Sequence, residues 1–301
     1  MAKGKAVSSS PTKVFLIRSM IRLLSVMPKF FGRGVGSLFA TISRWSKSRA
    51  YTTSKTNIAI CLPQLSAEQQ AEIIQQSLAH TGRLFSEAAK IWCKSDAENW
   101  INNIYGEEQV KATLRQGKGV LITGAHIGNW EVALYYLGSR YRFHCMYRPP
   151  RQLEMDEVIC KGRCKNSTTM VAGNSRGVMH LIESLKDGEV AAILSDQEPG
   201  HRAGVFVPFF GKPALTMTLV QKVQQKSGAE VYQIAAIRNQ KGTFDIHLEP
   251  LDVNTEMDEL VYAEKVNQHL ENIIRRFPEQ YQWSYKRFKT TEDGSKNIYR
   301  K

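Results

Sequence analysis

The sequence predicts an α/β protein: a layered mixed sheet flanked by helices, preceded by a basic amphipathic helix. Apolar, strand-like runs alternate with helical patterns of roughly 10–16 residues along most of the chain. Glycine and proline stand at the ends of several of these segments. The 301 residues are 42% hydrophobic and 23% charged, which is typical of a folded domain and not of a disordered chain.

The basic residues gather at the two ends of the chain. Residues 1–55 contain eleven Lys or Arg and no Asp or Glu, and residues 286–301 contain six basic and two acidic residues. The rest is close to neutral, although the net charge is +13. Two basic ends on a neutral body predict contact with an anionic surface, either a membrane or a nucleic acid.

The N-terminal segment is apolar but interrupted by charge. Its longest uncharged run, residues 34–43, has ten residues, whereas a spanning helix needs about 20. No small-residue cleavage site follows an unbroken apolar stretch, so a signal peptide is not expected either. We therefore expect this segment to be neither a simple transmembrane span nor a secretion signal.

The same segment is amphipathic when drawn as a helix. Positions 18, 22, 25 and 29 form one polar, mostly cationic stripe, and Pro28 is expected to end or kink the helix. The remaining surface is apolar: Phe15, Ile17, Met20, Ile21, Leu24 and Met27. Such helices usually lie in the membrane interface, although packing of the apolar face on the body is the alternative.

We predict a membrane-associating segment over residues 1–50 and one catalytic domain over 51–301. No nucleic-acid recognition motif is present, so no nucleic-acid partner is expected.

The body divides into alternating elements. Ser66, followed three residues later by Gln69, is a capping-box signal that opens a helix to about Trp92. We expect further helices at Asn129 to about Leu137, 154–164, 175–188, 212–228 and 255–277. We expect strands at 119–124, 142–147, 189–196, 229–238 and 243–251.

The five cysteines are an odd number without framework spacing, which suits a reducing compartment. Cys160 and Cys164 would share one helix face, but no third or fourth ligand lies nearby in the sequence. A metal site is therefore not predicted.

The stretch "GAHIGNWE", residues 124–131, contains the strongest candidate site. His126 falls in the turn after a predicted strand, Gly128 lets the backbone bend, and Asn129 suits a helix N-cap. Glu131 then lies in the first helical turn, where the helix dipole favours an anion. An imidazole held by a carboxylate is suited to general-base catalysis. The alternative is a histidine that caps a strand end beside a solvated glutamate. Zinc is poorly supported, because this is not the H-E-x-x-H pattern.

The motif "HIGNWE" resembles the H-x-x-x-x-D/E motif of lipid acyltransferases. The downstream sequence is similar to the late lauroyl/myristoyl acyltransferases of lipid A biosynthesis. The matching pieces, in the family's order, are "MYRPP", "KGR", "NSRGVMHLIESLKDGEVAAILSDQEPG", "GVFVPFFGKPALT", "AEVYQIAAIR" and "PEQYQWSYKRFK". The likeness covers nearly the whole chain to Lys289, and the ordered set is far more specific than H-x-x-x-x-E alone.

This resemblance implies a glycerolipid-acyltransferase-like fold and transfer of an acyl group. The donor would be the thioester of acyl-carrier protein, and the acceptor a hydroxyl on an acyl chain of a phosphorylated lipid A precursor. The reaction would take place at the cytoplasmic face of a Gram-negative inner membrane, without a metal or organic cofactor. His126 would be the general base with Glu131 as its partner, and whether Glu131 orients His126 or contacts the substrate stays open. The family pattern adds Arg163 and Asp196. Arg148 is a candidate for a phosphate or phosphopantetheine group, a solvated loop arginine being the alternative.

The chain departs from the family pattern in two places. Many members begin with a more continuous transmembrane helix, whereas this one is interrupted by charge, so interfacial or shallow anchoring is expected. The C-terminal motif often reads W-x-H-R-R-F-K, and here Tyr285 stands where the histidine would be. Two alternative functions stay open. One is acylation of a glycerophospholipid or other glycolipid from acyl-coenzyme A, and the other is a catalytically silent lipid-binding homologue.

Overall fold

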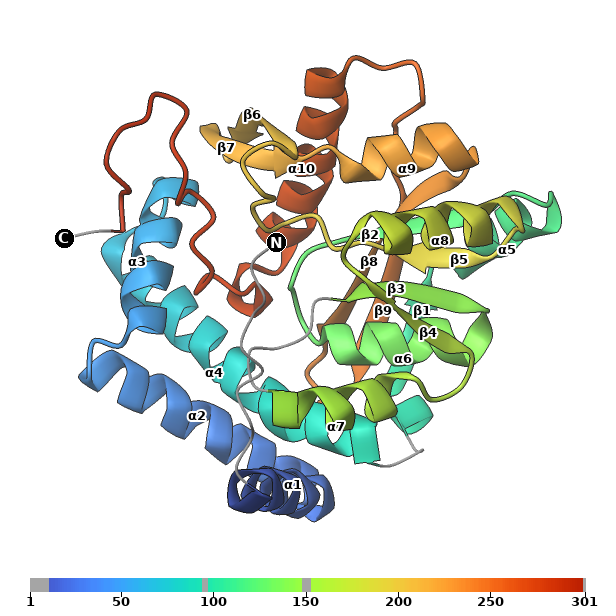
Figure 1. The fold of residues 1–301 in the computed structure, drawn as a ribbon. Helices are drawn as coiled ribbons and strands as arrows, with labels where there is room; N and C mark the ends of the chain where they lie inside the picture. Colours follow the sequence, from blue (N-terminus) through green and yellow to red (C-terminus); the bar gives the residue numbers. More distant parts are fainter. Residues whose placement is uncertain (1–10, 94–96, 148–152, 300–301) are drawn as a thin grey trace.

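The computed structural model describes residues 11–93, 97–147 and 153–299, and its centre is a seven-stranded sheet (Figure 1). The strand order is β1-β9-β8-β2-β5-β3-β4. The strands are β1 (Ile101–Tyr105), β2 (Val120–Thr123), β3 (Phe143–Tyr147), β4 (Thr168–Ala172), β5 (Val190–Ala192), β8 (Glu230–Arg238) and β9 (Phe244–Pro250). Only β8 and β9 pair antiparallel, and the other neighbours are parallel. The predicted mixed sheet is confirmed.

Helices cover both faces of this sheet. They are α1 (Pro11–Val26), α2 (Lys29–Trp45), α3 (Arg49–Cys61), α4 (Ala67–Cys93), α5 (Glu107–Arg115), α6 (Trp130–Arg140), α7 (Leu153–Arg163), α8 (Ser175–Lys186), α9 (Leu219–Ser227) and α10 (Glu259–Arg276). Alternate residues of each strand point to opposite faces. Thus Leu121 of β2 joins the core formed with α8, α9 and α10, while Val120 and Ile122 join the core formed with α5 and α6. Two apolar cores therefore enclose the sheet.

Three parallel strands lie side by side at the centre and end at the same edge of the sheet. β2 pairs with β5 on one side and with β8 on the other. His126 follows β2, Asp196 follows β5, and Arg238 is the last residue of β8. In sheets of this kind, ligands bind outside the carboxyl ends of the strands. The topology thus brings three ionisable side chains from distant parts of the sequence to one edge.

The capping signals read from the sequence are confirmed. Gln69 N lies 3.3 Å from Ser66 Oγ, and Ser66 N donates to Gln69 Oε1 at 2.9 Å, so the two residues form the reciprocal capping box that opens α4. Helix α4 then runs to Cys93, one residue beyond the expected end.

The helix expected over 212–228 is wrong in its first half. Residues 212–217 form β7 (Lys212–Met217), which pairs antiparallel with β6 (Gly204–Phe209), and only the second half is helical, as α9. Ala214, Leu215 and Thr216 are buried, because the hairpin packs against α10. Proline near the start of a segment is typical of a helix, but Pro213 lies in β7, opposite Pro208 and beside the hairpin turn. Phe209 and Phe210, in the run "VFVPFF", are buried in the core.

The last helix also begins later than expected. Asp258 is its N-cap and accepts a hydrogen bond from Leu260 N at 2.8 Å, so α10 starts at Glu259 and not at residue 255. Strands β1, β4 and β6 were not expected from the sequence. β1 and β4 are the edge strands of the large sheet, where half-exposed residues give a weak apolar pattern.

The N-terminal helices lie on α4, and Pro28 separates α1 from α2 as expected (Figure 1). A line of small residues, Gly32, Gly36 and Ala40, faces α4. A Cβ on Gly36 would come within 2.4 Å of the Ala79 carbonyl oxygen, so only glycine allows this approach. In the described part of the chain, no helix is both long and apolar enough to cross a membrane.

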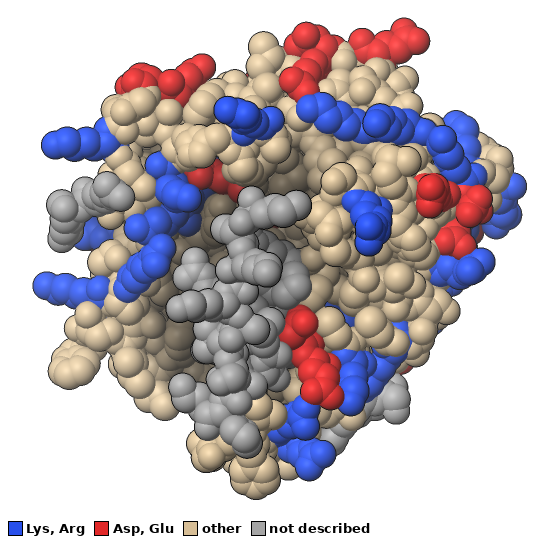
Figure 2. Space-filling model, in the orientation of Figure 1, with Lys and Arg blue, Asp and Glu red and all other residues tan. Residues whose placement is uncertain are grey.

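The outward surfaces of α1 and α2 are rich in large apolar side chains, and Arg18, Arg22, Arg33 and Arg44 are exposed among them. Ser25, expected in the polar stripe, is buried, and Ile21 beside it packs into the body. The exposed large apolar side chains of these two helices are Phe15, Leu16, Met20, Leu23, Val26, Phe31, Leu38, Ile42 and Trp45. Figure 2 shows Lys and Arg side chains gathered at the left of the molecule, where α3 and the C-terminal segment lie in Figure 1, beside a hollow in this face. Membrane association of residues 1–50 stays a prediction.

Candidate active site

The turn after β2 is built around Gly128. Its φ is +60°, and a Cβ there would lie 1.9 Å from the carbonyl oxygen of Ala236, so a side chain is excluded both by strain and by overlap. Asn129 then caps α6, and its side chain accepts from the backbone N–H of Glu131 at 3.0 Å and of Val132 at 3.3 Å. The predicted order of strand, turn, cap and helix is confirmed.

Most backbone N–H groups of this turn already donate within the protein. His126 N donates to Asp196 Oδ2 at 2.9 Å, Gly128 N to Gln280 O at 3.0 Å and Asn129 N to Ala236 O at 2.9 Å. Gln282 N in turn donates to His126 O at 3.0 Å. The turn is therefore fixed to β8, to the segment after β5 and to the C-terminal segment, which leaves few backbone donors for a substrate.

Asp196 is the carboxylate that holds the His126 imidazole. His126 Nδ1 lies 2.8 Å from Asp196 Oδ1, and the Asp196 side chain is only 2% exposed. Burial lowers the pKa of His126, but the charge and hydrogen bond of Asp196 outweigh it, and the net effect is a raised pKa. Burial would raise the pKa of Asp196, yet His126 keeps it lowered. A charged carboxylate therefore faces Nδ1 and favours the tautomer with the proton on that nitrogen.

The other ring nitrogen of His126, Nε2, is not bonded to Asp196. The His126 side chain is 20% exposed, so solvent or a substrate reaches it. Gln197 Nε2 lies 3.5 Å from both ring nitrogens, too far to compete with the Asp196 bond. The Trp130 ring meets the imidazole edge-on at 5.0 Å between centroids. With Nδ1 held, Nε2 keeps its lone pair and can accept a proton.

The expectation that Glu131 holds His126 is wrong in its geometry. The Glu131 carboxylate lies in the first turn of α6, as predicted, but its partners are Trp92 and Arg163. Trp92 Nε1 donates at 2.8 Å and Arg163 Nε at 3.0 Å, both to Oε2, while Arg163 Nη2 bonds Oε1. The five-residue step from His126 turns the two side chains toward different neighbours. Glu131 still acts on His126 through its charge, which raises the pKa of the imidazole.

Arg163 ends α7 and brings a guanidinium close to the turn that carries His126. Burial would lower its pKa, but Glu131 raises it, so the group stays charged. The Tyr147 ring lies 5.4 Å from the Arg163 guanidinium carbon. A cavity of about 10 Å³, enough for one water, borders Glu131 and Arg163.

The structure thus brings together four of the five predicted site residues. His126 and Asp196 form one pair, and Glu131 and Arg163 form a second pair close to it. Arg148, the fifth, lies outside the described residues. Trp92 also belongs to this group, but a tryptophan at the end of an amphipathic helix gives no signal in the sequence beyond that of a core residue.

Tyr285 occupies the position where the family often has histidine. Its hydroxyl accepts a hydrogen bond from Glu198 N at 2.9 Å, two residues beyond Asp196. Arg287, two residues further on, is buried and donates to Leu215 O at 2.7 Å and to Thr216 Oγ1 at 2.8 Å. The C-terminal motif therefore supports the loop that carries Asp196.

Comparison with known proteins decides the family. The model of the bacterial lipid A biosynthesis acyltransferases matches residues 2–290. The chain belongs to this family. It is 27% identical to the lipid A biosynthesis palmitoleoyltransferase of Escherichia coli K12 over 270 residues, covering 88% of this chain and 87% of that protein. It is 26% identical to the lauroyltransferase of the same organism, covering 89% and 87%. The myristoyltransferase of that organism is 22% identical, covering 95% and 89%.

Among solved structures, the 1-acyl-sn-glycerophosphate acyltransferase of Thermotoga maritima aligns with 81% of this lipid A acyltransferase and 95% of its own chain. The identity is 15% and the TM-score 0.34, a value that supports no inference about the site. Family membership makes the protein an acyltransferase of lipid A biosynthesis.

Proposed function

We propose that this acyltransferase moves a fatty acyl group from the thioester of acyl-carrier protein to a hydroxyl on an acyl chain of a lipid A precursor. The observation that carries the proposal is the His126–Asp196 pair at the carboxyl edge of the sheet, in a chain of this family. The proposed base is His126, and Asp196 replaces Glu131 as the group that orients it.

In the first step, His126 Nε2 removes the proton of the acceptor hydroxyl while that oxygen attacks the thioester carbonyl carbon. The Nδ1–H bond to Asp196 stabilises the imidazolium that forms. The tetrahedral intermediate then collapses, the carbon–sulfur bond breaks, and the leaving thiolate takes the proton from Nε2. The products are an ester and the free thiol of the carrier, so one proton has moved through His126 with no net change.

The developing oxyanion needs a donor, and Arg163 is the proposed one. Most N–H groups of the turn are occupied, as described above. Arg163 uses Nε and Nη2 to bind Glu131, so its second terminal nitrogen is held in a fixed orientation by those bonds. The role of Glu131 is then to position Arg163, and a charge fixed in a partly buried site stabilises an oxyanion without reorganising.

The proposed partners are both acidic, which suits the basic ends of the chain. The acyl-carrier protein and a phosphorylated lipid would be attracted by the cationic surface. The exposed apolar side chains of α1 and α2 would rest on the anionic inner membrane from its cytoplasmic side. The reaction as written needs no metal and no bound cofactor.

One assay tests the proposal. Purified protein in mixed micelles is incubated with tetra- and penta-acylated lipid A precursors and with acyl-carrier protein loaded with several chain lengths, and the lipids are weighed by mass spectrometry. A mass gain of one acyl group with wild type, absent with His126→Ala, is the expected result. If only acyl-coenzyme A supports transfer, the donor is wrong. If only glycerophospholipids gain an acyl group, the acceptor is wrong. If no lipid is acylated and the protein still binds lipid, the silent homologue is correct.

A further inference from the structure

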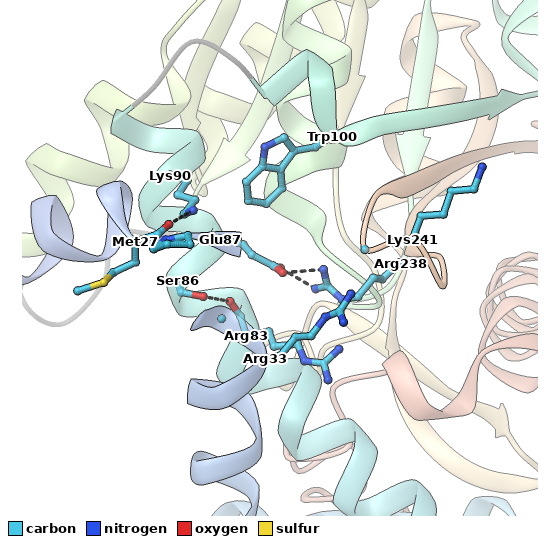
Figure 3. A pocket seen from close by; sticks show the side chains of 12 residues that line it. Met27, Arg33, Arg83, Ser86, Glu87, Lys90, Trp100, Arg238 and Lys241 are labelled. Atoms are coloured by element: carbon cyan, nitrogen blue, oxygen red, sulfur yellow. Dashed lines mark hydrogen bonds and ion pairs between the residues drawn. The ribbon is translucent and has the colours of Figure 1, made fainter. Parts of the chain in front are cut away.

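A second site lies next to the catalytic turn. A cavity of about 180 Å³ opens where α2, α4 and the end of β8 meet (Figure 3). One buried water needs only about 10–15 Å³. The space therefore accommodates a phosphoryl group together with a few bound waters.

The lining of this cavity is strongly cationic. One carboxylate, that of Glu87, lines the cavity. The five cationic side chains that line it are Arg33, Arg83, Lys90, Arg238 and Lys241. In Figure 3 the guanidinium groups of Arg33, Arg83 and Arg238 lie close together, whereas the Lys241 ammonium points away from them. Three arginines from three different elements thus converge on one space.

The Glu87 carboxylate already accepts three hydrogen bonds within the protein. Arg238 Nη1 and Nη2 each bond an oxygen of Glu87 at 2.6 Å, and Asn129 Nδ2 donates to the same carboxylate at 3.0 Å. Arg238 Nε also lies 3.3 Å from His80 Nδ1, and burial followed by the charges of Arg238 and Arg83 lowers the pKa of His80 to about 3. His80 is therefore neutral, and Arg238 is immobilised at the wall of the cavity.

Among the described residues, neither Arg33 nor Arg83 forms an ion pair within 4 Å, although the charge of Glu87, which is paired with Arg238, acts to raise the pKa of Arg83. Arg83 Nε is buried without a hydrogen-bond partner there, and burial together with the charges of Arg238 and Arg33 lowers the Arg83 pKa. The Arg83 stem packs where a Cβ on Gly36 would be, 2.7 Å from its Cγ, so the residue is held by packing. The three guanidinium groups share one carboxylate, Glu87, so their remaining repulsion costs free energy that a bound anion would recover.

We propose that Arg33, Arg83 and Arg238 bind a phosphoryl group of one of the two substrates. The proposal deepens the proposed function and rests on it for the identity of those substrates. The phosphoryl group belongs either to the phosphorylated lipid acceptor or to the phosphopantetheine arm of the donor. Asn129 links the cavity to the catalytic turn, since it binds Glu87 and caps the helix that carries Glu131.

The spacing along α4 agrees with this arrangement. Arg83 faces the cavity, and Trp92, nine residues later, donates to Glu131. Nine residues of α-helix span about 14 Å. A phosphoryl group in the cavity would therefore lie several bonds from the reacting hydroxyl or thioester, as it does in both substrates.

The test uses Arg33→Met and Arg83→Met in the full-length protein. Methionine keeps the apolar stem and removes the charge, and neither change orphans a carboxylate. Arg115→Met is the matched control, because Arg115 is exposed and ends α5 shortly before β2 begins, at the opposite edge of the sheet. Loss of one charged hydrogen bond predicts a KM roughly 10- to 100-fold higher for the substrate that carries the phosphoryl group.

KM measurements with each of the two substrates identify which one carries the bound phosphoryl group. If the acceptor supplies the group, the KM for a bisphosphorylated precursor rises in both variants. The KM for a precursor lacking one phosphate is then already high in wild type and changes no further. If the donor supplies it, the KM for acyl-carrier protein rises instead. Unchanged KM values for both substrates in both variants would overturn the proposal.

A binding measurement separates this proposal from the proposed function. Inorganic phosphate at constant ionic strength should raise the Tm of wild type and of Arg115→Met, but not that of the Arg33→Met/Arg83→Met double variant. Without phosphate, Arg83→Met should melt at or above the wild-type Tm, because a repelling charge has been removed. An equal phosphate effect in all proteins would eliminate the site, even if the protein acylates no lipid A precursor at all.

Discussion

His126 and Asp196 are joined by two hydrogen bonds, one from the imidazole Nδ1 at 2.8 Å and one from the His126 backbone N–H at 2.9 Å. The same carboxylate therefore fixes both the ring and the backbone of the proposed base. Since the carboxylate is buried and the ring is partly exposed, the pair has one side fixed in the protein and one side open to a substrate.

The activity should depend on pH through the protonation of His126. The proposed base acts only when neutral and its pKa is raised, so kcat/KM should fall as the pH drops through a value above the ordinary 6.5 of histidine. Asp196→Asn removes the stabilising charge, so the acid limb should move to lower pH, and kcat should fall about 10²–10⁴-fold. The pH profile of both proteins measures this. An acid limb at the same pH in both would show that Asp196 does not set the pKa of the base.

Glu131 should behave differently from Asp196. It is a positioning residue, so Glu131→Gln should lower kcat while moving the acid limb much less than Asp196→Asn does. Glu131→Ala leaves Arg163 without its carboxylate in a largely buried place, which should reduce the free energy of unfolding by about 3–5 kcal/mol. Chemical denaturation of Glu131→Ala, Arg163→Met and the double variant measures the coupling. If the losses of unfolding free energy in the two single variants simply add up in the double variant, Glu131 and Arg163 do not stabilise each other.

Gly128 should not tolerate a side chain. Gly128→Ala adds strain of about 1–2 kcal/mol from its left-handed backbone, and its Cβ would overlap the Ala236 carbonyl oxygen. The turn would have to move, so both stability and kcat should fall. Gly117→Ala is the control, because it has a similar φ of +75° and open space around the added Cβ. Equal activity in the two variants would show that the position of the turn is unimportant.

The exposed apolar face of α2 should bind lipid. Leu38, Ile42 and Trp45 are 61%, 52% and 86% exposed, so changing all three to serine removes apolar surface without opening a core cavity. Flotation with vesicles of phosphatidylethanolamine and phosphatidylglycerol should show the variant released and wild type bound. Changing the exposed pair Leu260 and Val261 of α10 to serine is the control. Retention of the α2 variant on vesicles equal to that of wild type would exclude this face.

Much of the fold could be predicted because local signals agreed with the tertiary structure. The capping box at Ser66, the cap at Asn129 and the apolar runs of β2 and β8 each indicated the correct element. The hairpin of β6 and β7 was missed in part because its second strand merges directly into α9. Without a turn signal at that junction, the sequence pattern predicts one helix over residues 212–228.

The pairing within the site could not be predicted from spacing along the chain. Glu131 is near His126 in sequence, whereas Asp196 is 70 residues away and becomes its partner because β2 and β5 are adjacent parallel strands. The expected strand over 189–196 already placed Asp196 at a strand end, so strand adjacency was the missing information. The cluster of Arg33, Arg83 and Arg238 could not be predicted either, because its arginines come from three separate elements whose adjacency the sequence does not show.

Helix α4 contacts both the N-terminal helices and the candidate active site. Glycines let α2 approach one side of it closely, while Trp92 near its end binds the carboxylate that holds Arg163. Helix α4 packs along α2, so the axes of the two helices lie about 10 Å apart. If the outer surface of α2 lies on a bilayer, this one layer of helix would set the height of the reacting groups above it. Only hydroxyls that reach that height can react, so the position of acylation would be chosen by a fixed distance as well as by shape.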